Sequence, residues 1–415
     1  MKIKVPYGGG EVAIEVDKKN VVGVVNLNNV KLGDERKIVE SALKNPTNSK
    51  PFEEFIDGAG NKEILIIVND ATRPSSASKI IPVIYDKIKT RNFKFIIATG
   101  SHRVPKDDEF RYIFGEYYPK LRDRVFVHES KKSSDMVCIG KAKDGSDAYV
   151  NKMVLEADRI VVIGSVEPHY FAGYTGGRKA FLPGVASYET ITANHKYALD
   201  PKAETLALRG NPVHEGMEHI ARLVKKEIFA VMVVLTEKEE LYAATAGNIF
   251  DSFYAATKKA DEIFSVKIGE KADIVVSVAT PPQDKNLYQS QKAADNGKLA
   301  LKKDGILILV AKCKDGIGEE SFLQMMSRHS SPQELIAGIS GGYKLGDHKA
   351  VKLAEISTWA QLWAVTGLKD EVVKNAFMMP FSDVREAIDE AIKEKGENAK
   401  ILFLMCGSVS VPKVE

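Results

Sequence analysis

The stretch ILIIVNDATRPSS, residues 64–76, joins an unbroken apolar run to a polar loop. The apolar run from Ile64 to Val68 is typical of a strand that is buried on both faces of a parallel sheet. The residues after the loop, from about 77 to 89, carry apolar side chains at helical spacing. Because a strand, a loop and a helix follow one another, this stretch predicts the repeating unit of an α/β fold.

The same order of elements recurs along the chain. Further strands are predicted at residues 94–98, 124–128, 159–163, 228–235, 273–278, 305–310 and 400–406, and helices at residues 32–44, 107–114, 249–263, 286–295, 350–363 and 383–394. A polar junction around Gly269 separates two such series, so we expect a domain over residues 1–269 and a smaller one over residues 270–415. The predicted fold is α/β, with two domains that each contain a mostly parallel sheet flanked by helices.

Composition narrows the class of protein. The chain has 415 residues, of which 44% are hydrophobic and 28% charged, as in an ordinary globular protein with two domains. The formal net charge of +3 creates no strong field for nucleic acid or for an anionic membrane. The first residues lack the pattern of a signal peptide, and no apolar stretch approaches the roughly 20 residues of a membrane span. We therefore expect a cytoplasmic protein.

The segment after the strand at residues 159–163 holds the densest group of reactive side chains. It contains His169, Lys179 and His195. Three glycines precede the lysine, and glycine permits positive φ and close approach of the backbone to a bound group: Gly173, Gly176 and Gly177. We interpret GYTGGRK as a loop shaped around a ligand.

This loop differs from a nucleotide-hydrolysing phosphate loop. That motif has the form G-x-x-x-x-G-K-[ST], but counting from Gly173 places Arg178 at the second glycine and Ala180 at the hydroxyl that binds magnesium. Lys179 is therefore expected either to react covalently or to hold an anion. The side chain of Arg178 could contact a phosphate or face solvent, and the sequence leaves both open.

Polar loops after other strands supply further candidates. Asp70 and Thr72 can hydrogen-bond sugar hydroxyls, and Arg73 offers a planar fork for a carboxylate or a phosphate. The alternative for Asp70 is that it only caps the following helix. His102 follows the strand at residues 94–98, where an imidazole is well placed for proton transfer. In open α/β sheets, ligands bind beside loops of this kind.

The second domain adds a polar helical face. Gln289 and Lys292 are three residues apart and so share one face of the predicted helix, next to Tyr288. Two other histidines, His214 and His219, are five positions apart instead of the four that a helical metal site requires, so we assign both to a helix surface.

Several of these motifs together resemble the nickel-dependent lactate racemase family. The motifs that carry the resemblance occur in the family's order and span most of the chain: NDATRP (69–74), ATGSHR (98–103), the spacing of His169, Lys179 and His195, and NLYQSQK (286–292). Members of this family are isomerases that interconvert the enantiomers of a 2-hydroxy acid. The resemblance implies an active site in the cleft between the two domains.

The resemblance also implies a cofactor that composition and spacing do not reveal. In this family, pyridinium-3-thioamide-5-thiocarboxylic acid mononucleotide is attached covalently to a lysine and binds nickel. The matching attachment point is Lys179, and His195 matches the protein ligand of the nickel. Soft sulfur and imidazole ligands suit nickel, so the implied metal site is chemically consistent.

The remaining roles follow from the same motifs. The resemblance implies that His102 and His169 are the acid/base pair. Four residues would contact the cofactor: Asp70, Thr72, Gly176 and Gly177. Four would contact the substrate: Arg73, Tyr288, Gln289 and Lys292.

The expected function is racemisation of D- and L-2-hydroxy acids, with lactate as the first candidate substrate. Malate, phenyllactate or a sugar acid are alternatives within the same class. An alternative of another class is a nucleotide- or metal-binding protein without turnover. The expected partners are a small-molecule 2-hydroxy acid and the cofactor-synthesis enzymes, with no nucleic acid and no membrane.

Overall fold

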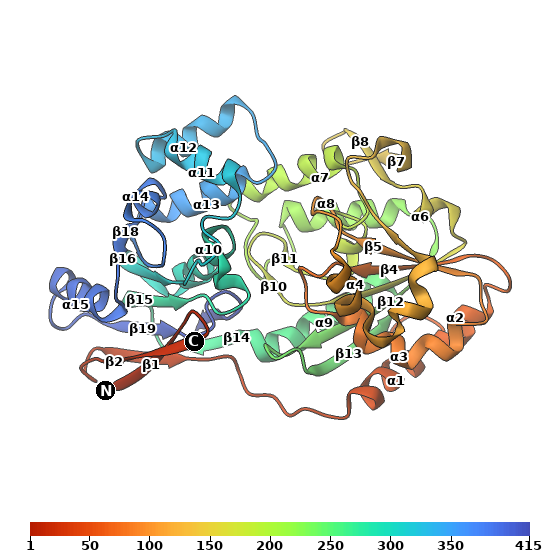
Figure 1. The fold of residues 1–415 in the computed structure, drawn as a ribbon, viewed down its shortest axis with the longest axis horizontal. Helices are drawn as coiled ribbons and strands as arrows, with labels where there is room; N and C mark the ends of the chain where they lie inside the picture. Colours follow the sequence, from red (N-terminus) through yellow and green to blue (C-terminus); the bar gives the residue numbers. More distant parts are fainter. The chain divides into compact units, whose positions relative to one another are not determined.

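The computed structural model describes residues 1–415, apart from the side chain of Ser340, and divides them into two compact units (Figure 1). One unit is Asn29–Ile263, and the other combines Met1–Asn28 with Phe264–Glu415. We call them the central unit and the terminal unit. Both are α/β, as predicted. The sequence suggested one boundary near Gly269, whereas the chain passes between the units near residue 28 and again near residue 263.

The central unit is built on a six-stranded sheet of order β13-β12-β9-β4-β5-β6. All neighbouring strands are parallel except β13, which is antiparallel to β12. The strands are β4 (Ile64–Asn69), β5 (Phe93–Ala98), β6 (Val125–Val127), β9 (Arg159–Ser165), β12 (Glu227–Leu235) and β13 (Leu241–Gly247). The long apolar runs that predicted β4, β5, β9 and β12 are buried, which confirms the parallel sheet.

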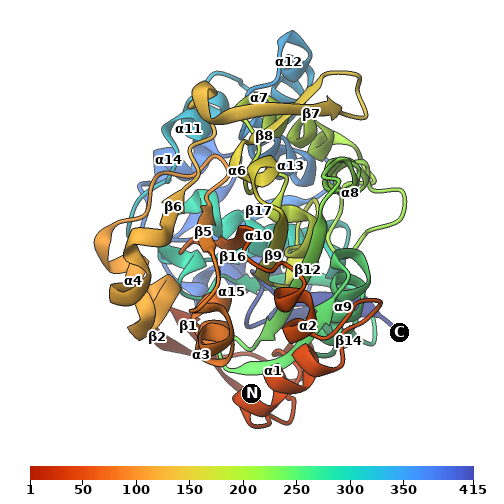
Figure 2. The same ribbon diagram turned by 90° about the vertical axis from the view of Figure 1, so that its right-hand side faces the viewer.

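Helices cover the sheet of the central unit on both faces. They are α1 (Glu35–Lys44), α2 (Phe52–Asp57), α3 (Ser76–Ile88), α4 (Asp107–Phe114), α5 (Tyr118–Leu121), α6 (Met153–Glu156), α7 (Tyr188–His195), α8 (Pro212–Leu223) and α9 (Ile249–Phe264). Ile66 of β4 packs in the core that α1–α4 cover, and Ile67, on the opposite face, is equally buried. Figure 2 shows α3 and α4 on one side of these strands, with α8 and α9 on the other.

Short elements connect this sheet to the loop of interest. A hairpin of β7 (Met136–Lys141) and β8 (Asp147–Asn151) precedes β9. After β9, the chain forms a small antiparallel ribbon of β10 (Pro168–His169) and β11 (Gly173–Tyr174), and then a 3-10 turn, Gly177–Ala180. The turn lies on the face opposite α1–α4, because the sulfur of Met232 on that face accepts a hydrogen bond from the N–H of Gly177.

The terminal unit has a second six-stranded sheet, of order β18-β17-β16-β15-β19-β3. All of its neighbouring strands are parallel. The strands are β3 (Val21–Val25), β15 (Ala272–Val278), β16 (Leu301–Val310), β17 (Gln361–Val365), β18 (Met379–Phe381) and β19 (Ile401–Leu404). The pairing of β3 with β19 explains why the first residues of the chain belong to this unit. Such a pairing of distant strands leaves no local signal in the sequence.

The other elements of the terminal unit are α10 (Leu287–Gly297), α11 (Glu320–Ser327), α12 (Pro332–Gly338), α13 (Asp347–Ser357), α14 (Asp370–Asn375), α15 (Val384–Lys395), the hairpin β1 (Lys2–Tyr7) and β2 (Gly10–Glu15), and the pair β14 (Ser265–Ile268) and β20 (Val411–Val414). The helix predicted at residues 350–363 is wrong at its end. Helix α13 stops at Ser357, and Trp363 lies in β17, where its ring stacks on Phe381 with centroids 4.9 Å apart.

Candidate active site

Three neighbouring parallel strands of the central unit deliver predicted site residues at one edge of the sheet. The strands β9, β4 and β5 are adjacent. Asp70 follows β4, His102 follows the end of β5, and His169 follows β9. Because the carboxyl ends of parallel strands share an edge, these three loops meet where α/β enzymes bind their ligands.

His102 is held by a buried carboxylate. Its Nδ1 atom lies 2.7 Å from Oδ2 of Asp70, and the hydroxyl of Thr72 donates to Oδ1 of Asp70 at 2.7 Å. A carboxylate only accepts hydrogen bonds, so Nδ1 of His102 carries a proton, and in the neutral form of the ring Nε2 is the acceptor. Asp70 is 5% exposed, whereas half of the His102 side chain is exposed. The carboxylate of Asp70 thus orients an imidazole, and the predicted contact of Asp70 with a cofactor stays a prediction.

The surroundings of Asp70 act on its pKa in opposite directions. Burial alone would raise the pKa of this carboxyl above its usual 3.8. Three neighbours outweigh burial and lower the pKa: His102 through its hydrogen bond and charge, Thr72 through its hydroxyl, and Arg73 through its charge. When the pKa of a carboxyl is lower in the folded state than in the unfolded state, the ionised carboxyl stabilises the fold at pH values above the unfolded-state pKa. This stability is lost as the pH falls through the folded-state pKa.

Asp70→Asn is therefore expected to remove about 1–3 kcal/mol of stability at neutral pH, the usual worth of a hydrogen bond to a charged group. The difference in free energy of unfolding between the wild type and the variant should shrink as the pH falls below 3.8, the ordinary value for Asp. Urea unfolding at a series of pH values measures it. Asp86→Asn is the control, because Asp86 pairs with Lys89 in solvent and should change stability much less. A pH-independent difference for Asp70→Asn would contradict this assignment.

His169 is buried and has the opposite proton arrangement. It is 7% exposed, and its Nδ1 atom accepts a hydrogen bond from the N–H of Ala172 at 3.3 Å. Its ring stacks on Tyr170 and meets the edge of Phe171, with centroids 5.1 and 4.5 Å apart. Since Nδ1 accepts, the neutral ring carries its proton on Nε2. In their neutral forms, the two predicted acid/base residues thus carry the ring proton on different nitrogens.

Lys179 and His195 meet at one aromatic ring. The Nζ atom of Lys179 lies 5.7 Å from the ring centroid of Phe171, and the ring of His195 meets the same phenyl edge-on, with centroids 5.2 Å apart. Burial, together with the charges of Lys179 and His102, lowers the pKa of His195 to about 3. His195, the last residue of α7, is therefore a neutral imidazole, the form in which histidine binds metals.

The glycines before Lys179 have a packing role. Gly176 and Gly177 adopt φ values of +80° and +54°, which other residues avoid. A Cβ atom would lie 2.8 Å from the backbone oxygen of Ser165 at Gly176 and 2.8 Å from the side chain of Phe253 at Gly177. The glycines thus let the loop press against β9 and α9. Their contact with a cofactor stays a prediction.

Arg73 has a partner that the sequence did not indicate. Its Nη1 atom lies 3.6 Å from Oε1 of Glu167, in the segment between β9 and β10. Both side chains are largely buried, with exposures of 25% and 17%. Glu167 and Phe171 are the residues of the site that sequence analysis missed. Each is separated from a predicted site residue by only one position, Pro168 or Tyr170, which was the available signal.

The predicted substrate residues of the terminal unit lie on α10. Asn286 caps this helix by accepting from the N–H of Gln289 at 3.0 Å. The ammonium of Lys349 lies 3.4 Å from the ring centroid of Tyr288 and donates to the Tyr288 carbonyl at 2.8 Å. Burial raises the pKa of the Tyr288 phenol to about 12, so this hydroxyl stays protonated at neutral pH. Gln289 and Lys292 are both partly buried on the same helix.

A lysine and three imidazoles lie in one α/β unit, and these are side chains that α/β enzymes use for covalent attachment and proton transfer. Among the described residues, no group of three or more His, Cys, Asp or Glu side chains is close enough to hold a metal ion alone. Within the same residues, no helix has the length and apolar character that a membrane span requires.

Comparisons with known proteins agree with this class. The model of the lactate racemase N-terminal domain matches residues 7–206, and that of the lactate racemase C-terminal domain matches residues 268–411. The chain is 34% identical to the lactate racemase of Thermoanaerobacterium thermosaccharolyticum, with 96% of each chain covered, and 31% identical to that of Lactiplantibacillus plantarum, with 98% of each covered.

Solved structures show the same relationship. The lactate racemase apoprotein from Thermoanaerobacterium thermosaccharolyticum superposes with a TM-score of 0.93 at 32% identity over 100% of both chains. A Thermotoga maritima protein, at 17% identity and a TM-score of 0.68, covers 92% of this chain and 98% of its own and shares the fold. The chain belongs to the lactate racemase family, a family of isomerases that racemise 2-hydroxy acids.

Proposed function

We propose that this protein interconverts D- and L-lactate. The observation that carries the proposal is the meeting of Lys179 and His195 at the ring of Phe171, which brings the proposed attachment point and the proposed metal ligand to one place. The two acid/base candidates, His102 and His169, follow neighbouring strands of the same sheet. Membership of the lactate racemase family supports the substrate class.

The residues present fit the implied cofactor. Lys179 offers the amine for attachment of pyridinium-3-thioamide-5-thiocarboxylic acid mononucleotide, and the neutral imidazole of His195 suits nickel. A metal at His195 would take its other ligands from outside the chain, as a sulfur-bearing cofactor allows. When bound, this cofactor supplies the acceptor for a hydride from the carbon that bears the hydroxyl. Four residues are proposed to contact it: Asp70, Thr72, Gly176 and Gly177.

The two histidines are proposed to share a reversible proton transfer. With Asp70 fixing a proton on Nδ1, His102 can accept the substrate hydroxyl proton at Nε2 and becomes an imidazolium. His169 would enter the same turnover as an imidazolium, give its Nε2 proton to the keto oxygen when the other face is reduced, and become neutral. One ring gains the proton that the other ring loses, so the reverse reaction starts with the imidazolium at His102.

Substrate binding is proposed to use Arg73 for the carboxylate, with Tyr288, Gln289 and Lys292 as further contacts. The support is the resemblance of NDATRP and NLYQSQK to the family motifs. Gln289→Ala and Lys292→Ala are each expected to raise the KM for the hydroxy acid by about tenfold, the loss of one hydrogen bond to a charged group. Steady-state kinetics with both enantiomers measures it, and an unchanged KM would remove that residue from the proposed site.

The test of the function uses protein co-expressed with the cofactor-synthesis enzymes. Intact mass should show an adduct on the chain, nickel should be present in the same sample, and each enantiomer of lactate should be converted to the other. Malate, phenyllactate and a sugar acid in the same assay test the alternative substrates. An adduct with nickel but no conversion of any of these acids would favour the alternative, a binding protein without turnover.

A further inference from the structure

Arg178, whose role the sequence left open, is a fully buried charge. It is 1% exposed, and its guanidinium stacks on the ring of Phe253, 4.2 Å from the ring centroid. Burial lowers its pKa to about 9, so the side chain remains charged at neutral pH. A buried charge is costly unless hydrogen bonds compensate it, so the partners of Arg178 show what the fold gains from it.

Most of these partners belong to the loop that precedes Lys179. The guanidinium donates to the carbonyls of Ala172, Thr175 and Gly176 at 2.7, 3.4 and 3.1 Å. A planar fork can bind several carbonyls at once, which an ammonium group cannot do with the same geometry. Arg178 thus holds three carbonyls of the glycine loop together with its own side chain, from the buried side of the loop.

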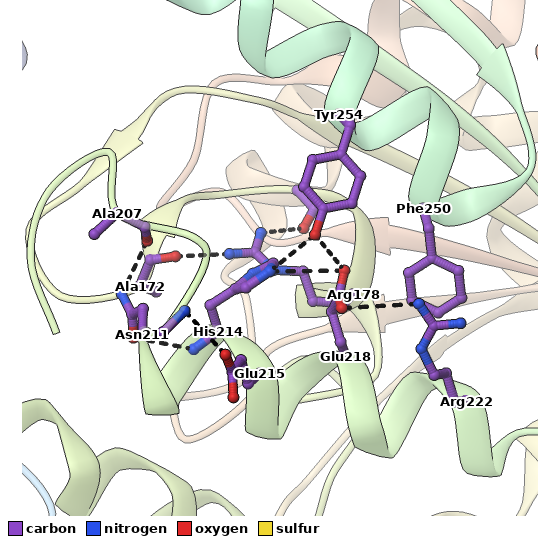
Figure 3. A network of polar contacts seen from close by, with 12 residues as sticks. Ala172, Arg178, Ala207, Asn211, His214, Glu215, Glu218, Arg222, Phe250 and Tyr254 are labelled. Carbon is purple, nitrogen blue, oxygen red and sulfur yellow. Dashed lines mark hydrogen bonds and ion pairs between the residues drawn. The ribbon is translucent and has the colours of Figure 1, made fainter. Parts of the chain in front are cut away.

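The Nε donor of Arg178 connects the loop to α8 (Figure 3). Its Nε atom donates to Nδ1 of His214 at 3.0 Å, and Nε2 of His214 lies 3.2 Å from the hydroxyl of Tyr254. That hydroxyl donates to Glu218 at 2.8 Å, so a carboxylate balances the buried charge through two neutral groups. His214, which we predicted on a helix surface, is 2% exposed because it takes part in this network.

One residue, Ala172, joins this network to the proposed chemistry. The carbonyl of Ala172 accepts from Arg178, while the N–H of the same residue donates to Nδ1 of His169. Asn211 holds the preceding carbonyl, that of Phe171, at 2.9 Å. The residues that Arg178 fixes are therefore the ones that orient His169 and that lead into Lys179.

We propose that Arg178 is a positioning residue that orients His169 through the backbone of Ala172 and holds the loop from which Lys179 extends. This inference rests on the proposed function, because it assigns His169 to proton transfer with one enantiomer. It also makes a claim about the fold alone, namely that the N–H of Ala172 is protected as long as the Arg178 fork is intact.

The test compares Arg178→Met and Arg178→Lys with the control Arg159→Met. Arg159 also stacks on a phenylalanine, 5.0 Å from the Phe55 ring centroid, but it starts β9 at the strand end away from the site. In single-turnover assays, keto-acid formation from the enantiomer that depends on His169 should fall by about tenfold to a hundredfold in both Arg178 variants, since small displacements of a reacting group have such effects. The rate of keto-acid formation from the other enantiomer, expressed per adduct-bearing chain, should change by less than about twofold.

A second measurement does not depend on turnover. Hydrogen exchange in the cofactor-free chain should be faster at Ala172 in both Arg178 variants and unchanged there in Arg159→Met. Equal losses for both enantiomers, or unchanged exchange at Ala172, would overturn the inference. Failure of Arg178→Lys to fold would also overturn it, because the role of Arg178 would then be structural. The proposed function fails separately, if the wild type carries no adduct or does not racemise.

Discussion

Lys179→Ala is expected to abolish both the covalent adduct and racemisation. The amine of Lys179 is the proposed attachment point, and no neighbouring side chain of the same loop provides another amine. Without the cofactor, no group accepts the hydride while an imidazole takes the hydroxyl proton. The racemisation rate should therefore fall to the background of the assay. Intact-mass spectrometry after co-expression with the cofactor-synthesis enzymes measures the adduct, and chiral analysis of lactate measures turnover.

A matched lysine separates loss of attachment from loss of charge. Lys131 lies 4.8 Å from the ring centroid of Tyr188, as Lys179 lies over Phe171, but it is exposed on the surface of the same unit. Lys131→Ala should keep the adduct mass and the full rate. If Lys179→Ala retained the adduct, the attachment would lie elsewhere on the chain. If it lost the adduct but still racemised lactate, the proposed mechanism would be wrong.

Replacing either proposed acid/base histidine is expected to slow racemisation strongly. One of the two half-reactions, the oxidation of D-lactate or of L-lactate to the keto acid, should remain. His102→Ala and His169→Ala should each reduce the full interconversion by about a hundredfold to ten-thousandfold, the usual contribution of a positioned acid or base. Each variant should still oxidise the enantiomer that depends on the other histidine. The two variants should therefore have opposite preferences for D- and L-lactate in single-turnover formation of the keto acid.

The control for this pair is His219→Gln. His219 is a histidine of the same unit whose Nε2 atom lies 2.8 Å from the carbonyl of Lys141, on the outer side of α8. This change should leave both half-reactions unaltered. The same enantiomer preference in His102→Ala and His169→Ala would show that the two imidazoles do not divide the enantiomers between them.

Much of the fold was predictable because a long apolar run bounded by polar loops fits few secondary structures other than a buried strand. The runs that became β4, β9 and β12 are too continuous for an exposed helix, and the polar loops after them ended each strand clearly. The error at residues 350–363 has a physical cause. A short apolar run such as that of Gln361–Val365 fits a buried strand and a buried helix equally well, so only its pairing with β16 decides between them.

The motifs of the site were visible, but their contacts were not. The loop order placed Asp70, His102 and His169 at one sheet edge. The bond between Asp70 and His102 joins residues 32 positions apart, and it depends on the packing of β4 beside β5. The sequence analysis did not single out Phe171, whose ring contacts both Lys179 and His195 in the folded chain.

The sequence by itself determined which reactive groups this protein possesses and that strands of a parallel sheet would carry them, because residue type and apolar periodicity are local properties of the chain. Only the tertiary structure decided the state of each group. His102 and His169 hold their protons on different nitrogens, and Arg178 is buried instead of solvated, because of neighbours far away in the chain. Hydrogen-bond partners and burial arise from packing between distant segments, and they set the tautomers, charges and orientations on which the chemistry depends.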